Sequence, residues 1–221
     1  MKSVAFVKTV ALGWAVMAAV SATQAQAHAS FVSGLPFAGK SYVATLNIGH
    51  GCEEPVSADT IKVEVSVPAG ISSIRPADAV FGPASLETSD GKVTKMIWNK
   101  PTAAQASDTH FYQVTFKLSI PAGTELTTLA FDTVQTCSGN ATVAWTGDEA
   151  PKLKILPARA PGWNKYTAQT ELNADAVASY FSDALIVWYN NTAYSANTIT
   201  AGAIKTPLTA IPAGAEFWVK Y

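Results

Sequence analysis

The chain has 221 residues, and its 15 basic and 16 acidic side chains leave a formal net charge of −1. Without an excess of positive charge, the protein is not expected to bind nucleic acid. Only 14% of the residues are charged and Thr, Ala and Val are abundant, which is typical of a β-rich secreted protein rather than a helical cytosolic one.

The first 27 residues have the three parts of a secretory signal peptide. Two lysines come first, an apolar run extends from Val10 to Val20, and Ala25-Gln26-Ala27 forms a site of the kind that signal peptidase cleaves. The apolar run is shorter than the roughly 20 residues that span a bilayer. We expect a periplasmic or secreted protein that starts at His28 and has no membrane span after cleavage. The alternative is an uncleaved N-terminal anchor.

Residues 28–156 have the pattern of successive β-strands. Apolar and polar residues alternate in Ser41–Ile48, Ile61–Val67 and Phe111–Ile120, which indicates half-buried strands. Turn signals such as Pro-Ala-Gly and Asp-Gly separate these runs. The sequence therefore predicts a mostly β fold, an immunoglobulin-like antiparallel β-sandwich. Three shorter runs complete the predicted strands: Val93–Trp98, Thr128–Val134 and Thr142–Trp145.

The composition changes at Pro151–Gly162, which contains three prolines and a glycine. Beyond this break, Asn173–Phe181 predicts a short helix, and Leu185–Tyr189 and Glu216–Tyr221 are largely apolar. We interpret residues 163–221 as a small C-terminal α+β appendage to the sandwich.

The chain has two cysteines, Cys52 and Cys137. An even number of cysteines in an exported chain predicts one disulfide. Because the loop that it closes is long, this bond is expected to stabilise the fold by roughly 4–5 kcal/mol. The alternative is a pair of thiolate ligands for a soft metal ion such as Cu(I).

Cleavage after Ala27 turns His28 into a candidate metal chelator. Its free α-amine and its ring Nδ1 close a six-membered chelate, and paired nitrogen donors suit tetragonal Cu(II). The ordinary pKa of an α-amine is about 7.7–8.0, so a metal ion displaces its proton at modest cost near neutral pH. A carboxylate is expected to fill a further position.

The segment Gly49–Pro55 brings an imidazole, a sulfur and two carboxylates between two predicted strands, in His50, Cys52, Glu53 and Glu54. It is either a metal-binding loop or a polar turn pinned by the disulfide. His110 precedes a strand without an obvious partner, and we interpret it as a surface residue.

Together these motifs resemble the YcnI-like family of bacterial copper-binding proteins over about residues 28–156. The resemblance implies an immunoglobulin-like sandwich that binds Cu(II) through the amine and imidazole of His28 and through a glutamate of the loop after the second strand. That glutamate is expected to be Glu53, with Glu54 or His50 as alternates, and Trp145 is expected beside the metal. The motifs that carry the resemblance are His28, Gly-His-Gly-Cys at 49–52, Val-Gln-Thr-Cys at 134–137 and Ala-Trp-Thr-Gly-Asp-Glu at 144–149.

The function that this resemblance implies is copper trafficking or cuproenzyme assembly without catalysis. The expected partners are the copper ion and a copper transporter or another periplasmic copper protein. One alternative is a copper monooxygenase that acts on polysaccharide, which requires His50 or His110 to reach the metal. The other is a metal-free adhesion or scaffold module in which His28 has no role.

Overall fold

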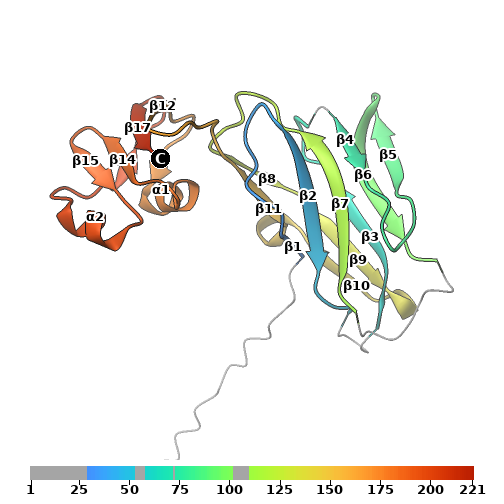
Figure 1. Ribbon diagram of the computed structural model, residues 1–221. Helices are drawn as coiled ribbons and strands as arrows, with labels where there is room; N and C mark the ends of the chain where they lie inside the picture. The colour runs from blue at the N-terminus through green and yellow to red at the C-terminus, as the bar shows by residue number, and fades with distance from the viewer. Residues whose placement is uncertain (1–28, 53–57, 72, 102–109) are drawn as a thin grey trace, which may run out of the picture.

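The computed structural model describes residues 29–52, 58–71, 73–101 and 110–221. They form two lobes that a short segment connects (Figure 1). The larger lobe is an antiparallel β-sandwich of the immunoglobulin-like type, which confirms the predicted fold class. Among the described residues, no helix has the length and hydrophobicity needed to cross a bilayer.

One sheet of the sandwich has its long central strands in the predicted places. Tyr42, Ala44 and Leu46 of β2 are buried, and Val114 and Phe116 of β7 meet them from the neighbouring strand. These are the apolar faces that the alternation predicts. The order across this sheet is β1 (Ser30–Phe31), β2 (Ser41–Ile48), β7 (Tyr112–Ser119) and β4 (Ile74–Pro76).

The second sheet closes the sandwich from the other side. Its order is β10 (Thr142–Trp145), β9 (Thr133–Cys137), β3 (Thr60–Ser66), β6 (Lys92–Asn99) and β5 (Ser85–Ser89). Two short 3-10 helices, η2 (Ser138–Asn140) and η3 (Gly147–Glu149), stand on either side of β10. Between the sheets, the rings of Phe31 and Phe116 pack on Phe131 at centroid distances of 5.3 and 5.6 Å, which forms the centre of the core.

The prediction of a single strand over Thr128–Val134 is wrong. The segment forms two strands, β8 (Thr127–Ala130) and β9, which belong to different sheets. The chain leaves one sheet at Phe131, whose N–H bonds the Pro151 carbonyl, and joins the other at Thr133. The partner of β8 is β11 (Lys152–Ile155), so regular structure continues past Pro151, because proline is tolerated before the first residue of a strand.

The smaller lobe contains the predicted α+β region. Asn173 caps α1 (Ala174–Tyr180) by accepting a hydrogen bond from the N–H of Ala176 at 2.8 Å, as expected for an N-cap asparagine. The second helix is α2 (Thr198–Ala203). The main sheet has the order β12 (Trp163–Thr167), β17 (Glu216–Lys220), β14 (Ile186–Tyr189) and β15 (Thr192–Tyr194), and β13 (Leu172–Asn173) pairs with β16 (Ala210–Ile211).

The hydrophobic core of this lobe, in which Phe181 and Phe217 pack edge to face at 5.6 Å, also includes Leu126 and Leu156 of the larger lobe. Arg159 lies where the lobes join. Its guanidinium pairs with Asp183 and lies 5.2 Å from the ring of Phe37 and 4.8 Å from that of Tyr221. One cation therefore links a residue of the sandwich to the last residue of the chain.

Candidate metal centre

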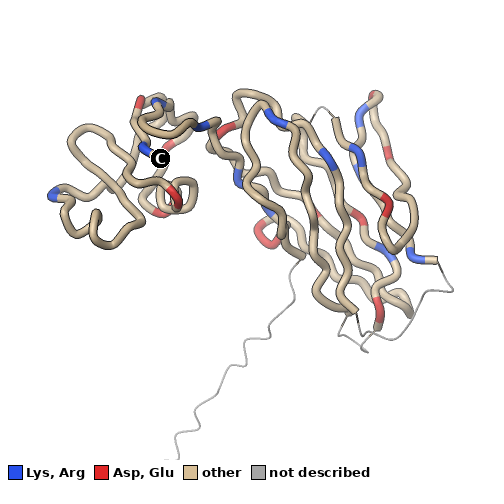
Figure 2. The backbone as a smooth tube through the Cα atoms, viewed as in Figure 1, with Lys and Arg blue, Asp and Glu red and all other residues tan. Residues whose placement is uncertain are grey.

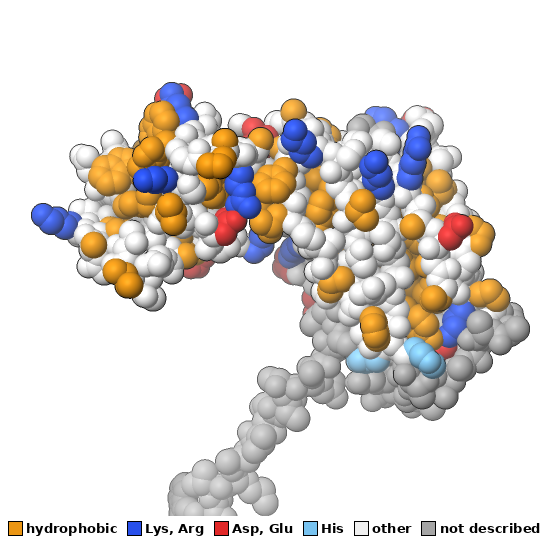
Figure 3. All heavy atoms as spheres, in the orientation of Figure 1, with side chains coloured by type: hydrophobic (Ala, Val, Ile, Leu, Met, Phe, Trp, Pro, Cys, Tyr) orange, Lys and Arg blue, Asp and Glu red, His pale blue; other side chains and the backbone are white. Residues whose placement is uncertain are grey.

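Three strand ends meet at one end of the sandwich. Ser30, at the start of β1, pairs with Asn47 near the end of β2, and Ile48 pairs with Tyr112 at the start of β7. His50 and His110 each lie two residues beyond this last pair. Figure 3 shows the two described histidines on the same end of the lobe.

The position of His110 shows what the sequence interpretation missed. The residue is exposed, as expected for a surface histidine, but the antiparallel register brings it to the end of the sheet that also carries His50. Its ring lies 6.5 Å from the ring of Tyr112. The signal was present in the sequence, because pairing the two strongest strand predictions as antiparallel neighbours places both histidines just outside the sheet.

The buried side chain of Gln135 on β9 holds the backbone of His50. Its amide donates hydrogen bonds to the His50 carbonyl at 2.8 Å and to Thr60 Oγ1 at 2.6 Å. The His50 Nδ1 lies 2.6 Å from the carbonyl oxygen of Gly51. Because a carbonyl only accepts, the neutral ring carries its proton on Nδ1 and its lone pair on Nε2. This is the tautomer in which an imidazole binds a metal through Nε2.

Cys52 and Cys137 form the predicted disulfide, with a Cα–Cα distance of 6.0 Å. The alternative of two thiolate ligands does not hold in this structure. The bond ties the segment after β2 to the end of β9, and it fits an oxidising compartment outside the cytoplasm. On the other side of residues 53–57, Ala58 exchanges two backbone hydrogen bonds of 2.9 Å with Cys52.

A buried ion pair at the edge of the five-stranded sheet is linked to the other sheet by Tyr112 of β7, at the same end of the sandwich. Lys100, after β6, pairs with Asp59, before β3, and donates to Tyr112 Oη at 2.6 Å, while Tyr112 donates to Asp59 at 2.8 Å. Burial alone lowers the pKa of Lys100, but the hydrogen bonds and charges of Asp59 and Tyr112 outweigh it, so this pKa is raised. The pKa of Tyr112 is raised as well, chiefly because burial disfavours the charged phenolate. The sequence interpretation missed this network, whose members are far apart in the chain.

Trp145 lies at the end of β10 and is only 3% exposed. It pairs with Thr133, whereas Cys137 is at the other end of β9, about 13 Å away along the strand. The disulfide therefore does not bring Trp145 to the loop after Cys52. Trp145 belongs instead to the same buried core as Ala29, the residue after His28, so its expected place beside the metal stays a prediction.

The other expected ligands, His28, Glu53 and Glu54, lie outside the described residues. Within the described part of the chain, no three His, Cys, Asp or Glu side chains are grouped closely enough to hold a metal ion. The flanks of the expected ligands are described: Ala29 is buried beside β2, and Cys52 is fixed by its disulfide. The donor that is described, the Nε2 of His50, is a nitrogen and fits Cu(II) chemistry.

Comparisons with known proteins found a family model and a solved structure that match the chain. A family model described as "Domain of unknown function (DUF1775)" matches residues 28–164, more than half of the chain. Among solved structures, the chain is similar to an uncharacterized protein from Nocardia farcinica with an immunoglobulin-like fold. The identity is 20%, the match covers 58% of this chain and 98% of that one, and the TM-score is 0.49. No curated protein matches the sequence.

Proposed function

This chain belongs to the DUF1775 family, the family of the YcnI-like copper proteins, and from that membership we propose that it is an exported protein that holds Cu(II) through His28. The observation that carries the proposal is the meeting of the β1 start, the β2 end and the β7 start at one end of the sandwich. His28 precedes Ala29 by one residue and Glu53 follows Cys52 by one residue. Both described flanks therefore belong to elements that meet at this end.

In the proposed site, the α-amine of His28 and its Nδ1 bind the metal and a side chain of the following loop supplies the next ligand. Glu53 is the expected carboxylate, with Glu54 or His50 as alternates. The disulfide and the Cys52–Ala58 hydrogen bonds support this assignment, because they fix both ends of the five-residue segment that carries the two acids. A loop whose two ends are held has less conformational freedom to lose when it supplies a ligand.

His50 is the alternate with direct structural support. Its backbone is anchored by Gln135, and its Nδ1–Gly51 contact fits the tautomer that carries its proton on Nδ1. If His50 closes the site, the metal has three nitrogen donors instead of two nitrogens and an oxygen. These two ligand sets are distinguishable by the nitrogen hyperfine coupling in the copper paramagnetic-resonance spectrum.

The proposed role is to carry copper outside the cytoplasm in trafficking or cuproenzyme assembly, without catalysis. The proposed partners are a copper transporter or another periplasmic copper protein. Export through cleavage after Ala27 is part of the same proposal, because only cleavage frees the His28 amine. The disulfide supports an oxidising location.

The test is copper titration of protein whose N-terminus has been verified by mass as His28. We expect one Cu(II) per chain with an axial paramagnetic-resonance signal. His28→Ala and a single residue added before His28 should each weaken binding at least about 100-fold, because each removes one nitrogen of the chelate. Glu53→Ala and His50→Ala identify the next ligand, and Glu87→Ala on the distant β5 is the matched control. Equal affinity with and without the added residue would falsify the proposed chelate.

A polysaccharide monooxygenase is the second candidate, and the shared position of His50 and His110 favours testing it. Such an enzyme needs a second histidine on the metal. The copper-loaded protein with a reductant should release oxidised sugars from chitin or cellulose if this role is correct, and His110→Ala should abolish the release. Absence of release from the copper-loaded, reduced protein supports the non-catalytic role.

A further inference from the structure

The smaller lobe exposes three tryptophans on one face of its main sheet. Trp163, Trp188 and Trp218 are 53%, 41% and 44% exposed, whereas Trp98 and Trp145 of the sandwich are 0% and 3% exposed. Large aromatic side chains normally have most of their surface removed from water, and several exposed together usually indicate a binding surface. The alternation of the strands explains the arrangement, because Phe217 and Val219 beside Trp218 point into the core.

The strand register brings the three indoles together. Trp218 pairs directly with Trp188 across β17 and β14, so their Cβ atoms are about 5 Å apart. Trp163 lies on β12, diagonally across from Trp218, because Trp163 pairs with Lys220. The three side chains line an open, apolar hollow of about 500 Å³. We call this surface the tryptophan face.

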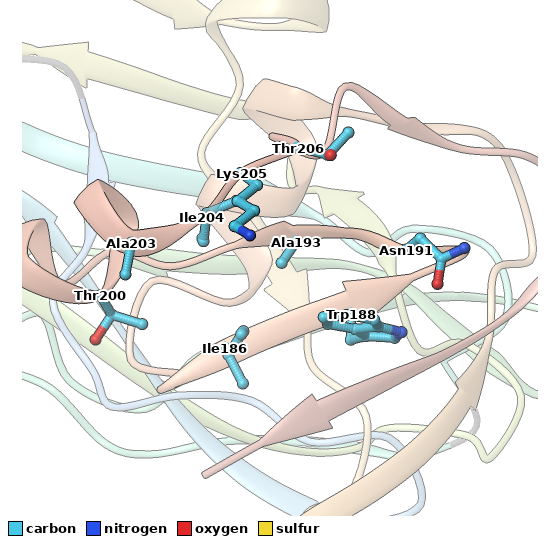
Figure 4. A pocket seen from close by; sticks show the side chains of 9 residues that line it. All are labelled: Ile186, Trp188, Asn191, Ala193, Thr200, Ala203, Ile204, Lys205 and Thr206. Atoms are coloured by element: carbon cyan, nitrogen blue, oxygen red, sulfur yellow. The ribbon is translucent and has the colours of Figure 1, made fainter.

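A second hollow of about 450 Å³ adjoins the tryptophan face and shares Trp188 with it. Its floor is apolar, with Ile186 and Ala193, but Asn191, Lys205 and Thr206 stand at its wall. Figure 4 shows the Lys205 side chain extending into this hollow from the segment after α2. Both volumes are within the range of ligand sites, about 300–1,000 Å³.

Two lysines lie close to the indole rings of the tryptophan face. Lys220 Nζ lies 5.9 Å from the ring of Trp163, and Lys165 Nζ lies 6.0 Å from the ring of Trp218. Lys165 is paired with Glu216 at 2.7 Å. For Lys205 and Lys220, the described residues contain no ion-pair partner. The surface therefore combines flat apolar rings with neutral hydrogen-bonding groups and two cations, Lys205 in the second hollow and Lys220 beside Trp163.

We propose that the tryptophan face binds an acidic polysaccharide, a chain of pyranose rings that carries carboxylates. A pyranose ring has an apolar face of C–H groups, which suits the electron-rich face of an indole, and an equatorial rim of hydroxyls, which suits Asn191 and Thr206. The carboxylates pair with Lys205 and Lys220. Two adjoining hollows accept successive sugar units, so the length of the site fits a polymer. The proposal does not depend on copper.

The charge pattern disfavours other occupants. A second copy packed on this face would bury the charges of Lys205 and Lys220, whereas charged residues are depleted from interface cores. The indoles line a hollow on a β-sheet, whereas binding to a membrane surface is typical of amphipathic helices with a continuous apolar face. Basic and acidic residues are interspersed over the described parts of both lobes (Figure 2), whereas nucleic acid selects dense positive charge.

The test is affinity electrophoresis of the full mature chain in gels that contain polygalacturonate, with EDTA present to exclude metal bridging. Dextran is the neutral comparison. We expect retardation by polygalacturonate that salt weakens, and a loss of affinity of at least about tenfold in Trp188→Ala and in Trp218→Ala. Lys205→Gln and Lys220→Gln should each lose about threefold or more. Ile199→Ala, which removes an exposed apolar side chain of the same lobe outside both hollows, should bind as the unaltered protein does.

Trp188→Phe is the control for misfolding. It keeps an aromatic face and should retain more affinity for polygalacturonate than Trp188→Ala. Unchanged copper affinity in the tryptophan variants separates this proposal from the copper site. The proposal is overturned if polygalacturonate does not retard the protein, or if the tryptophan substitutions do not change the retardation. It is also overturned if dextran retards the protein equally, or if the protein binds phosphatidylglycerol vesicles but not polygalacturonate. A dimer that Trp218→Ala dissociates, with no retardation, overturns it in favour of a second copy.

Discussion

The two lobes differ in where their candidate binding residues lie relative to the strands. In the sandwich, the histidines lie beyond the ends of paired strands, and links that cross between elements hold their surroundings: the disulfide, Gln135 and the Asp59–Lys100 pair. In the smaller lobe, the tryptophans occupy regular strand positions, and the sheet register alone sets their spacing. Loss of a single cross-link should therefore disturb the first site and leave the second intact.

The largest effect is expected from removal of the disulfide. Cys52→Ala with Cys137→Ala opens a loop spanning 85 residues and should reduce the free energy of unfolding of the sandwich by about 4–5 kcal/mol. Hydrogen exchange followed by mass spectrometry should show lost protection in β2 and β7 and unchanged protection in β17. Equal loss of protection in both lobes would mean that they unfold as one unit, and the contrast between the two sites would then not hold.

Lys100→Met should follow in size. It leaves the Asp59 carboxylate buried without its cation, and breaking a buried pair in this way costs about 3–5 kcal/mol. The double variant Asp59→Asn with Lys100→Met should recover part of the loss in urea unfolding. A single variant as stable as the unaltered protein would show that this network does not hold the two sheets together.

Arg159→Ala tests the connection between the lobes. Two ring contacts and one partly exposed ion pair are lost, worth about 1–2 kcal/mol in all. We expect little change in either lobe's own unfolding and more independent tumbling of the lobes in nitrogen-15 relaxation. Lys152→Ala, which removes an exposed ion pair within the sandwich, is the control and should leave the tumbling unchanged.

The smallest effect is a loss of stability at alkaline pH. The pKa values of Lys100 and Tyr112 are both raised in the folded state, so the folded protein holds these protons more tightly than the unfolded chain. The stability that these two groups contribute is therefore fully present below about pH 10 and is lost as the pH rises through their folded pKa values. Urea midpoints measured between pH 8 and 11.5 should fall less steeply in Tyr112→Phe. An identical slope would exclude Tyr112 as a source of the effect.

Local alternation determined what the sequence predicted well. The bounds of Ser41–Ile48 and Thr142–Trp145 are as predicted, because strict period-two patterns leave one register for burial. Short strands such as β1 and β4 were missed, since two or three residues carry no period. The split at Phe131 was missed because a change of sheet leaves the alternation almost undisturbed.

Long-range pairing explains what the sequence could not show about the sites. Trp163, Trp188 and Trp218 belong to three strands separated by long segments, and only their pairing assembles one face. The run Glu216–Tyr221 is largely apolar in the sequence, whereas the structure turns Trp218 away from its buried neighbours. The Asp59–Lys100–Tyr112 network was invisible for the same reason.

The two hydrogen bonds between Cys52 and Ala58 have a consequence for how this protein can diversify. They join the two residues that flank the segment 53–57, and the disulfide links Cys52 to Cys137 of β9 in the other sheet. Both links are made by backbone groups of Cys52 and Ala58 and by the disulfide, so side-chain substitutions between these two residues leave the links in place. If the proposed copper site is correct, exchanging acids, imidazoles or thioethers between Cys52 and Ala58 is a way to change the ion preference of the site without altering the strands that carry it.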